Sequence, residues 1–206
     1  MSLEDDDIPQ LSADTQAILS QFLKERDDQE KVGEVSENWQ LSQFWYDEET
    51  QKVFGKICKK LIREYDEDIK IALLSCPSLF ETVRSIADNV KIFEYDERFK
   101  KYENDFVHYD YNLGDSEDYL KEFTGSFDVI ILDPPFLSEE CLTKSYKIVS
   151  RIKNENSLII LNTGSIQRDL AVKLGLKESN FKPRHKNNLA NDFSCFANFD
   201  VDKYIL

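Results

Sequence analysis

The amino-acid sequence predicts an α/β fold with a doubly wound, mostly parallel seven-stranded sheet and an N-terminal helical extension. Short apolar runs, typical of strands buried on both faces, alternate along the chain with segments of helical spacing. This alternation indicates βαβ units with right-handed crossovers, and therefore a parallel sheet. The last two strand-like runs have no helix between them, so we expect a hairpin with one antiparallel member.

Residues 1–37 are expected to form an acidic tail and a helix, and residues 38–206 a single globular domain. The first ten residues, MSLEDDDIPQ, are acidic and expected to be mobile. A helical pattern of apolar residues follows Ser12, which is a suitable N-cap. After the aromatic-rich segment NWQLSQFWYDEET (38–50), a second helix is expected over about 49–65.

The remaining elements are predicted in order along the chain. Strands are expected over 69–75, 90–95, 105–111, 127–133 and 157–163. Helices are expected over 78–87, 116–123, 138–152 and 165–175. The helix over 138–152 begins with Ser138 and two glutamates, which suit an N-cap and the helix dipole. Two final strands in the tail are expected to flank a basic, asparagine-rich loop.

The composition argues against several classes of function. Forty acidic and 26 basic residues give a formal net charge of −14. This charge disfavours nucleic acid and anionic membranes as partners and favours a basic protein. Four scattered cysteines and two histidines offer few metal ligands, so no metal site is expected. Reduced thiols and no apolar run near 18 residues indicate a cytoplasmic protein without a transmembrane helix, and we expect a monomer.

The candidate site consists of residues that directly follow the predicted strands. In open α/β sheets, ligands bind outside the carboxyl ends of the strands. Four successive strands are followed by Ser75, Cys76 and Pro77, by Glu94 and Asp96, by Asp110 and Tyr111, and by Asp133. An acid after the second strand can accept the ribose hydroxyls of an adenosyl cofactor, and one after the third can accept the adenine amine. The sequence leaves open whether Glu94 or Asp96 holds the ribose.

The loop after the first strand, SCPS (75–78), helps to distinguish between cofactors. It lacks the Gly-x-Gly pattern that cradles a pyrophosphate. S-adenosylmethionine contains no phosphate and tolerates a glycine-poor loop better than a dinucleotide would. The loop could equally be a tight turn that caps the next helix.

The stretch FDVIILDPPF (127–136) carries the most specific motif. Asp133, Pro134, Pro135 and Phe136 resemble the (D/N)PP(F/Y/W) motif of class I methyltransferases that methylate amines. The resemblance implies that Asp133 and the Pro134 carbonyl accept hydrogen bonds from the target nitrogen and that Phe136 packs beside it. Methyl transfer is an in-line displacement, so alignment by rigid prolines can supply much of the acceleration.

Longer blocks resemble the eukaryotic elongation factor 1-alpha lysine methyltransferases, a family once labelled as N6-adenine DNA methyltransferases. The blocks are LEDDDIPQLSADT, NWQLSQFWY, FEYDERF, YDYN, DPPFLSEECL and PRHKNNLANDF. The resemblance implies an S-adenosylmethionine-dependent protein-lysine N-methyltransferase that acts on elongation factor 1-alpha, itself a basic protein. It also implies that Gln43, Phe44 and Trp45 close over the methionine end of the cofactor. Phe44 and Trp45 could equally pack the N-terminal helices on the sheet.

An N6-adenine methyltransferase acting on DNA or RNA is the alternative function. Such an enzyme would need a track of basic residues for the nucleic-acid strand.

The segment KPRHKNNLANDF (182–193) holds the densest positive charge of the chain. It is either a solvated hairpin loop or a loop that docks the substrate. His185 could accept a proton there. However, desolvation lowers the pKa of a target lysine, so we expect proton loss to solvent without a dedicated base.

Overall fold

The computed structural model describes residues 35–65, 68–187 and 192–205. The chain from Glu37 onward forms one compact unit, to which the following account refers. The expected acidic tail and the helix after Ser12 lie outside the described residues, and the proposed division at residue 37 stays a prediction. No helix of the described residues is long and apolar enough to cross a membrane.

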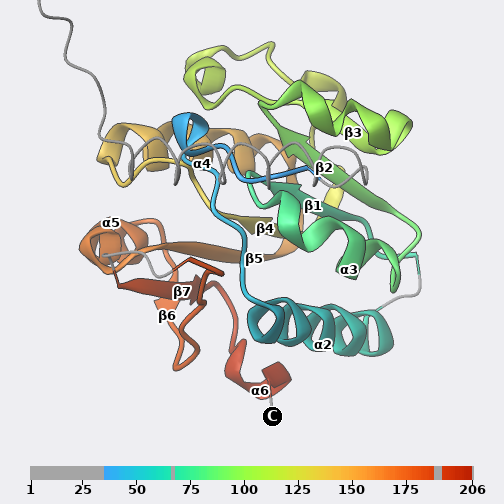
Figure 1. Cartoon of the computed structure of the whole chain (residues 1–206), viewed down its shortest axis with the longest axis vertical. Helices are drawn as coiled ribbons and strands as arrows, with labels where there is room; N and C mark the ends of the chain where they lie inside the picture. Colours follow the sequence, from blue (N-terminus) through green and yellow to red (C-terminus); the bar gives the residue numbers. More distant parts are fainter. Residues whose placement is uncertain (1–34, 66–67, 188–191, 206) are drawn as a thin grey trace, which may run out of the picture. The chain divides into compact units, whose positions relative to one another are not determined.

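Seven strands form one mixed sheet (Figure 1). They are β1 (Ile71–Leu74), β2 (Val90–Glu94), β3 (Phe106–His108), β4 (Phe127–Leu132), β5 (Lys153–Gly164), β6 (Lys177–Glu178) and β7 (Phe193–Ala197). Their order in the sheet is β3-β2-β1-β4-β5-β7-β6. Strands β1 to β5 pair in parallel, and β7 is antiparallel to both β5 and β6. The predicted mostly parallel, seven-stranded sheet and its antiparallel hairpin are therefore confirmed.

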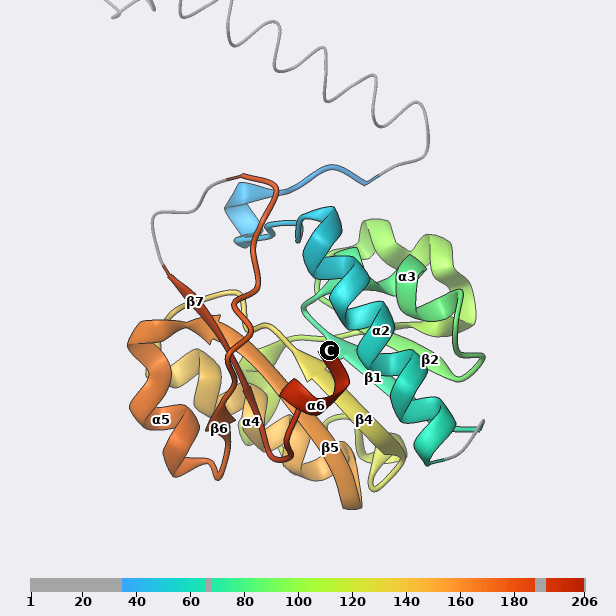
Figure 2. The same ribbon diagram turned by 90° about the horizontal axis from the view of Figure 1, so that it is seen from below.

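Helices cover both faces of the sheet (Figures 1 and 2). They are α2 (Glu48–Glu64), α3 (Phe80–Arg84), α4 (Glu139–Ile152), α5 (Arg168–Lys173) and α6 (Asp202–Ile205). Helices α2, α3 and α6 pack together on one side. Buried residues of α4 and α5 join alternate residues of the central strands in a core on the other side, including Ala72, Leu74, Ile130 and Leu132. This alternation follows from the period of two in a strand.

Helices α2 and α4 begin at the caps that their sequences favour. The Asp47 side chain accepts a hydrogen bond from the Thr50 backbone N–H at 2.7 Å, and the Ser138 hydroxyl accepts one from the Cys141 N–H at 3.2 Å. Each cap is followed by two glutamates, which interact favourably with the helix dipole. The predictions for the helices over 49–65 and 138–152 are therefore confirmed.

Short 3-10 helices connect several of these elements. They are η1 (Trp39–Leu41), η2 (Pro77–Leu79), η3 (Glu97–Asp105), η4 (Tyr111–Asp115), η5 (Lys121–Phe123) and η6 (Ser165–Gln167). The helices expected over 78–87 and 165–175 each form as a 3-10 turn followed by a short α-helix. The second ends near Gly175, whose φ of 85° few other residues adopt.

The prediction of a helix over 116–123 is wrong. The segment forms turns and the single 3-10 turn η5. Leu120 adopts a left-handed conformation with φ of 57°, which interrupts a helix, and its side chain is 6% exposed. The Arg151 guanidinium also donates to the Tyr119 carbonyl at 2.7 Å. Tertiary contacts thus override the local helical spacing.

Candidate active site

A cavity of about 650 Å³ lies at the carboxyl ends of β1, β2, β3 and β4. The register of the parallel strands explains why residues from all four reach it. Leu74 of β1 pairs with both Phe93 of β2 and Leu132 of β4. Beyond these pairs, the Asp133 N–H donates to the Leu74 carbonyl at 3.0 Å and the Ser75 N–H to the Phe93 carbonyl at 2.9 Å. The residues after the strands therefore emerge at one level.

Most of the predicted site residues meet in this cavity. Those that line it are Gln43, Phe44, Trp45, Ser75, Pro77, Glu94, Asp110, Tyr111, Asp133, Pro134, Pro135 and Phe136. His185 and Phe193 line it as well, from the tail of the chain. Two predicted residues, Cys76 and Asp96, are not among the lining residues.

Cys76 faces the core. It is 2% exposed, and its thiol donates to the Ile131 carbonyl at 3.5 Å. Burial, and after it the charge of Asp133, raises the pKa of the Cys76 thiol well above its usual value. The SCPS loop therefore contributes Ser75 and Pro77 to the cavity. Ser75 has a φ of 53°, so a non-glycine residue adopts the left-handed conformation in this turn.

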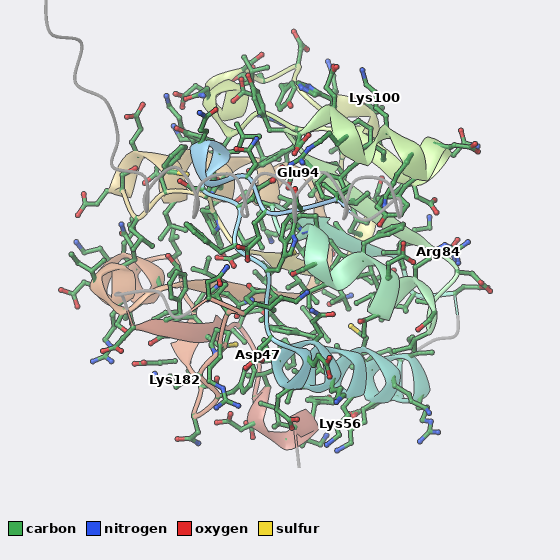
Figure 3. All side chains as sticks on the ribbon, viewed as in Figure 1. Asp47, Lys56, Arg84, Glu94, Lys100 and Lys182 are labelled. Carbon is green, nitrogen blue, oxygen red and sulfur yellow. The ribbon has the colours of Figure 1, made fainter. Side chains whose placement is uncertain are left out.

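Glu94 and Asp96 occupy different surroundings, which bears on the alternative that the sequence left open. Glu94, labelled in Figure 3, is 4% exposed, and its Oε1 accepts a hydrogen bond from the Gln43 amide at 3.1 Å. Desolvation raises the pKa of Glu94 to about 7, although the Asp96 and Tyr95 N–H groups and the Gln43 amide partly oppose this shift. Glu94 is thus a buried acid at the wall of the cavity.

Asp96 is instead paired with Arg98. Its carboxylate accepts from the Arg98 guanidinium at 2.7 and 2.9 Å and from the Arg98 backbone N–H at 2.9 Å. Burial alone would raise the pKa of Asp96, but the hydrogen bonds and charge of Arg98 outweigh it and leave the pKa lowered. The Arg98 guanidinium also donates to the side-chain oxygen Oε1 of Gln43 at 3.3 Å, so the Asp96–Arg98 pair supports the residue that donates to Glu94.

Asp110 lies at the end of β3, where it caps η4. Its Oδ1 accepts from the Asn112 backbone and side-chain amides at 2.9 and 3.0 Å. The Asp110 N–H donates to the Tyr119 hydroxyl at 2.7 Å. These bonds fix the Asp110 carboxyl group at the wall of the cavity.

The DPPF stretch forms another wall of the cavity. Pro134 is buried, whereas Phe136 is 42% exposed and contacts the Tyr111 ring at a centroid distance of 5.9 Å. Two successive prolines have fixed φ angles and no N–H, so the carbonyls of this turn are held in place. Phe136 is therefore available at the mouth of the cavity to pack against a ligand.

The Asp133 side chain contacts two residues from distant parts of the chain. The Tyr46 hydroxyl donates to Asp133 Oδ2 at 2.5 Å, and His185 Nε2 lies 3.9 Å from the same oxygen. Tyr46 and His185 are joined by an isolated antiparallel bridge, and their rings lie 5.0 Å apart. In the sequence, Tyr46 is only the last residue of the block NWQLSQFWY. No spacing signal could connect residue 46 with residue 133.

The charge of the cavity wall is negative. Of the described lining residues, Glu94, Asp110 and Asp133 carry carboxyl groups, and none is a lysine or an arginine. Such a wall suits a cationic ligand and disfavours a phosphate. Among the described residues, no group of three or more His, Cys, Asp or Glu side chains could hold a metal ion.

Comparison with known proteins identifies the family. A family model described as probable N6-adenine methyltransferase matches residues 37–201. The chain belongs to this family. Among the relatives of the chain, protein-lysine N-methyltransferase CG9154 of Drosophila melanogaster is 44% identical over 220 residues, covering 98% of both chains. EEF1A lysine methyltransferase 1 of Homo sapiens is 41% identical over 211 residues, covering 96% of this chain and 95% of its own.

The solved structures are more distant than these relatives. A TehB-like SAM-dependent methyltransferase from Corynebacterium glutamicum is 12% identical and covers 88% of this chain and 97% of its own, with a TM-score of 0.48.

Proposed function

We propose that this chain is a protein-lysine N-methyltransferase that uses S-adenosylmethionine and acts on elongation factor 1-alpha. The observation that carries the proposal is the Asp133–Phe136 turn, which lines one cavity together with Glu94 and Asp110. The relatives named as lysine methyltransferases support the choice of lysine, because they align with nearly the whole chain.

The cavity suits the cofactor in size and charge. The sulfonium of S-adenosylmethionine is a cation without a phosphate, which matches a wall with three carboxyl groups and no lysine or arginine among the described lining residues. Glu94 would accept hydrogen bonds from the ribose hydroxyls and Asp110 from the adenine amine. Gln43, Phe44 and Trp45 would enclose the methionine end. When bound, the cofactor supplies the methyl group.

The residues of the DPPF turn would hold the target nitrogen. Asp133 and the Pro134 carbonyl would accept its N–H groups, so that the nitrogen lone pair points away from them and along the line of displacement. Phe136 would pack against the methylene groups of the lysine and the partly cationic amine. Only the neutral amine has the lone pair, and a cavity shielded from solvent lowers the pKa of the lysine ammonium.

The N6-adenine alternative has less support. Its main support is the name of the family, probable N6-adenine methyltransferase. A nucleic-acid strand would need basic residues around the cavity, but the described lining residues include no lysine or arginine. The chain as a whole carries a formal net charge of −14.

The proposal is tested by incubating the protein with methyl-labelled S-adenosylmethionine and, separately, purified elongation factor 1-alpha, DNA and RNA. We expect label in elongation factor 1-alpha, at lysine in mass spectra of its peptides. Label in DNA or RNA but not in protein would contradict the proposal.

The substitution Asp133→Ala should abolish the transfer. The affinity for S-adenosylmethionine should change by less than about tenfold, because Asp133 acts mainly on the target amine in the transition state. Asp169→Ala is the matched control, since Asp169 is an exposed acid in the first turn of α5 and does not line the cavity. It should methylate at the wild-type rate.

The proposal also includes a cytoplasmic location and a monomeric state. The four cysteines are buried free thiols. Such thiols are typical of proteins in a reducing compartment.

A further inference from the structure

Asp133 receives a hydrogen bond from a tyrosine that lies behind the cavity wall. Tyr46 is 1% exposed and is not among the residues that line the cavity. Its hydroxyl donates to Asp133 Oδ2 at 2.5 Å. Within the described part of the chain no hydrogen bond to the other carboxylate oxygen, Oδ1, is seen, and Oδ1 can therefore accept from a ligand. Tyr46 can therefore act on the reaction through Asp133 without touching the substrate.

Tyr46 is held firmly in this position. Its backbone N–H donates to the Ser78 hydroxyl at 3.3 Å, and its carbonyl accepts from the Gln51 amide at 2.8 Å. Its ring stacks on Phe54 at a centroid distance of 5.8 Å, and its backbone forms the bridge with His185. Contacts from α2, from the loop after β1 and from the tail thus hold the Tyr46 side chain, and with it the hydroxyl that donates to Asp133, in one position.

Tyr46 also remains a donor over the working pH range. Burial, and after it the negative charge of Asp133, raises the pKa of the Tyr46 hydroxyl well above its usual value. The hydroxyl is consequently protonated whenever the protein is folded at neutral or moderately alkaline pH. Such a hydroxyl can donate a hydrogen bond to one carboxylate oxygen throughout this pH range.

A carboxylate without this anchor would be less well oriented. Rotation about the terminal torsion of aspartate has a broad energy minimum, so the two oxygens do not have fixed directions by themselves. In-line methyl transfer depends on the direction of the nitrogen lone pair, and a small misalignment can lower the rate considerably. Holding one oxygen fixes the direction in which the other can accept an N–H.

We propose that Tyr46 is a positioning residue, whose hydroxyl anchors one oxygen of Asp133 so that the other accepts the target amine in line with the methyl group. This proposal rests on the function proposed above. It concerns the methyl-transfer step and not the binding of the cofactor, because Tyr46 lies outside the cavity wall.

The test is Tyr46→Phe, which removes the hydroxyl and keeps the ring against Phe54 and His185. We expect kcat with elongation factor 1-alpha to fall about 10- to 100-fold. The dissociation constant for S-adenosylmethionine and the KM for the protein substrate should stay within about threefold of wild type, because binding does not use the hydroxyl. A kcat equal to that of wild type would overturn the proposal.

Tyr146→Phe is the matched control. Its hydroxyl donates to the Leu174 carbonyl at 3.1 Å, and Tyr146 packs against the core on the α4 side of the sheet. This variant also loses one tyrosine hydroxyl bond, but away from the cavity. It should keep the wild-type kcat. All variants are compared at a temperature at which their thermal unfolding curves show them folded. An equal loss of kcat in both tyrosine variants would mean a general effect on the fold and would overturn the proposal.

Rescue by a conservative variant separates positioning from a merely structural role. Incorporation of 3-fluorotyrosine at position 46, which keeps the ring and the donor, should restore the rate, and failure to restore it would also count against Tyr46 as the anchor. If wild-type protein methylates no lysine, the proposed function itself fails, and the two outcomes are distinguishable.

Discussion

At the residue scale, the unusual feature of the site is a buried acid that is partly protonated near neutral pH. Glu94 has a pKa of about 7 because burial disfavours its charged form. Its carboxylate form is the one that can accept hydrogen bonds from both ribose hydroxyls. Binding of the cofactor should therefore depend on pH, in a direction that follows from the sign of the shift.

We expect the affinity for S-adenosylmethionine to fall about tenfold when the pH is lowered from about 8 to about 6. Below a pKa of about 7 most Glu94 side chains carry a proton in the empty site, and binding must then expel it. Isothermal titration calorimetry at several pH values measures the effect. Glu94→Gln cannot titrate, so its affinity should be lower but independent of pH. A pH dependence of equal slope in wild type and variant would show that another group is responsible.

At the scale of elements, the close packing of η4 on α4 positions the loop that carries Asp110. Gly114 of η4 is buried, and a Cβ added there would lie 2.3 Å from the Lys144 carbonyl oxygen of α4. A backbone atom within a helix cannot move aside easily. The absence of a side chain at residue 114 is therefore required for η4 to lie against α4.

Gly114→Ala should lower the free energy of unfolding by about 1–3 kcal/mol, which is typical of overpacking. Chemical unfolding monitored by circular dichroism measures this change. Gly55→Ala in α2 is the matched control. A Cβ at Gly55 would approach the Thr82 side chain at 3.1 Å, and alanine favours a helix, so we expect a change of less than about 1 kcal/mol. Equal stability of the two variants would contradict this account of Gly114.

At the scale of the whole molecule, the net charge of −14 is expected to raise the rate of association with a basic protein substrate. We expect kcat/KM for elongation factor 1-alpha to fall several-fold as the salt concentration rises from about 50 to about 300 mM. The kcat at saturating substrate should change little, because steering acts before the complex forms. Steady-state kinetics over this range provide the measurement, and a kcat/KM that does not change with salt would exclude electrostatic steering.

The whole fold was predictable to a large extent, but the site only in part. The strands were predictable because strands buried on both faces have continuous apolar runs. The residues at their carboxyl ends were predictable because parallel strands align these ends. The false helix over 116–123 shows the limit of local spacing. The left-handed Leu120 in that segment is buried, and Arg151 binds the adjacent Tyr119 carbonyl.

The sequence by itself determined the class of fold and the chemistry of the candidate site. A motif of four adjacent residues and four strand ends could be recognised because each is local in the chain. Only the tertiary structure decided that Glu94 lines the cavity while Asp96 binds Arg98, and that Cys76 faces the core. It alone brought Tyr46 and His185 to Asp133. The physical reason is that these arrangements depend on contacts between surfaces that form only when segments distant in the sequence pack together.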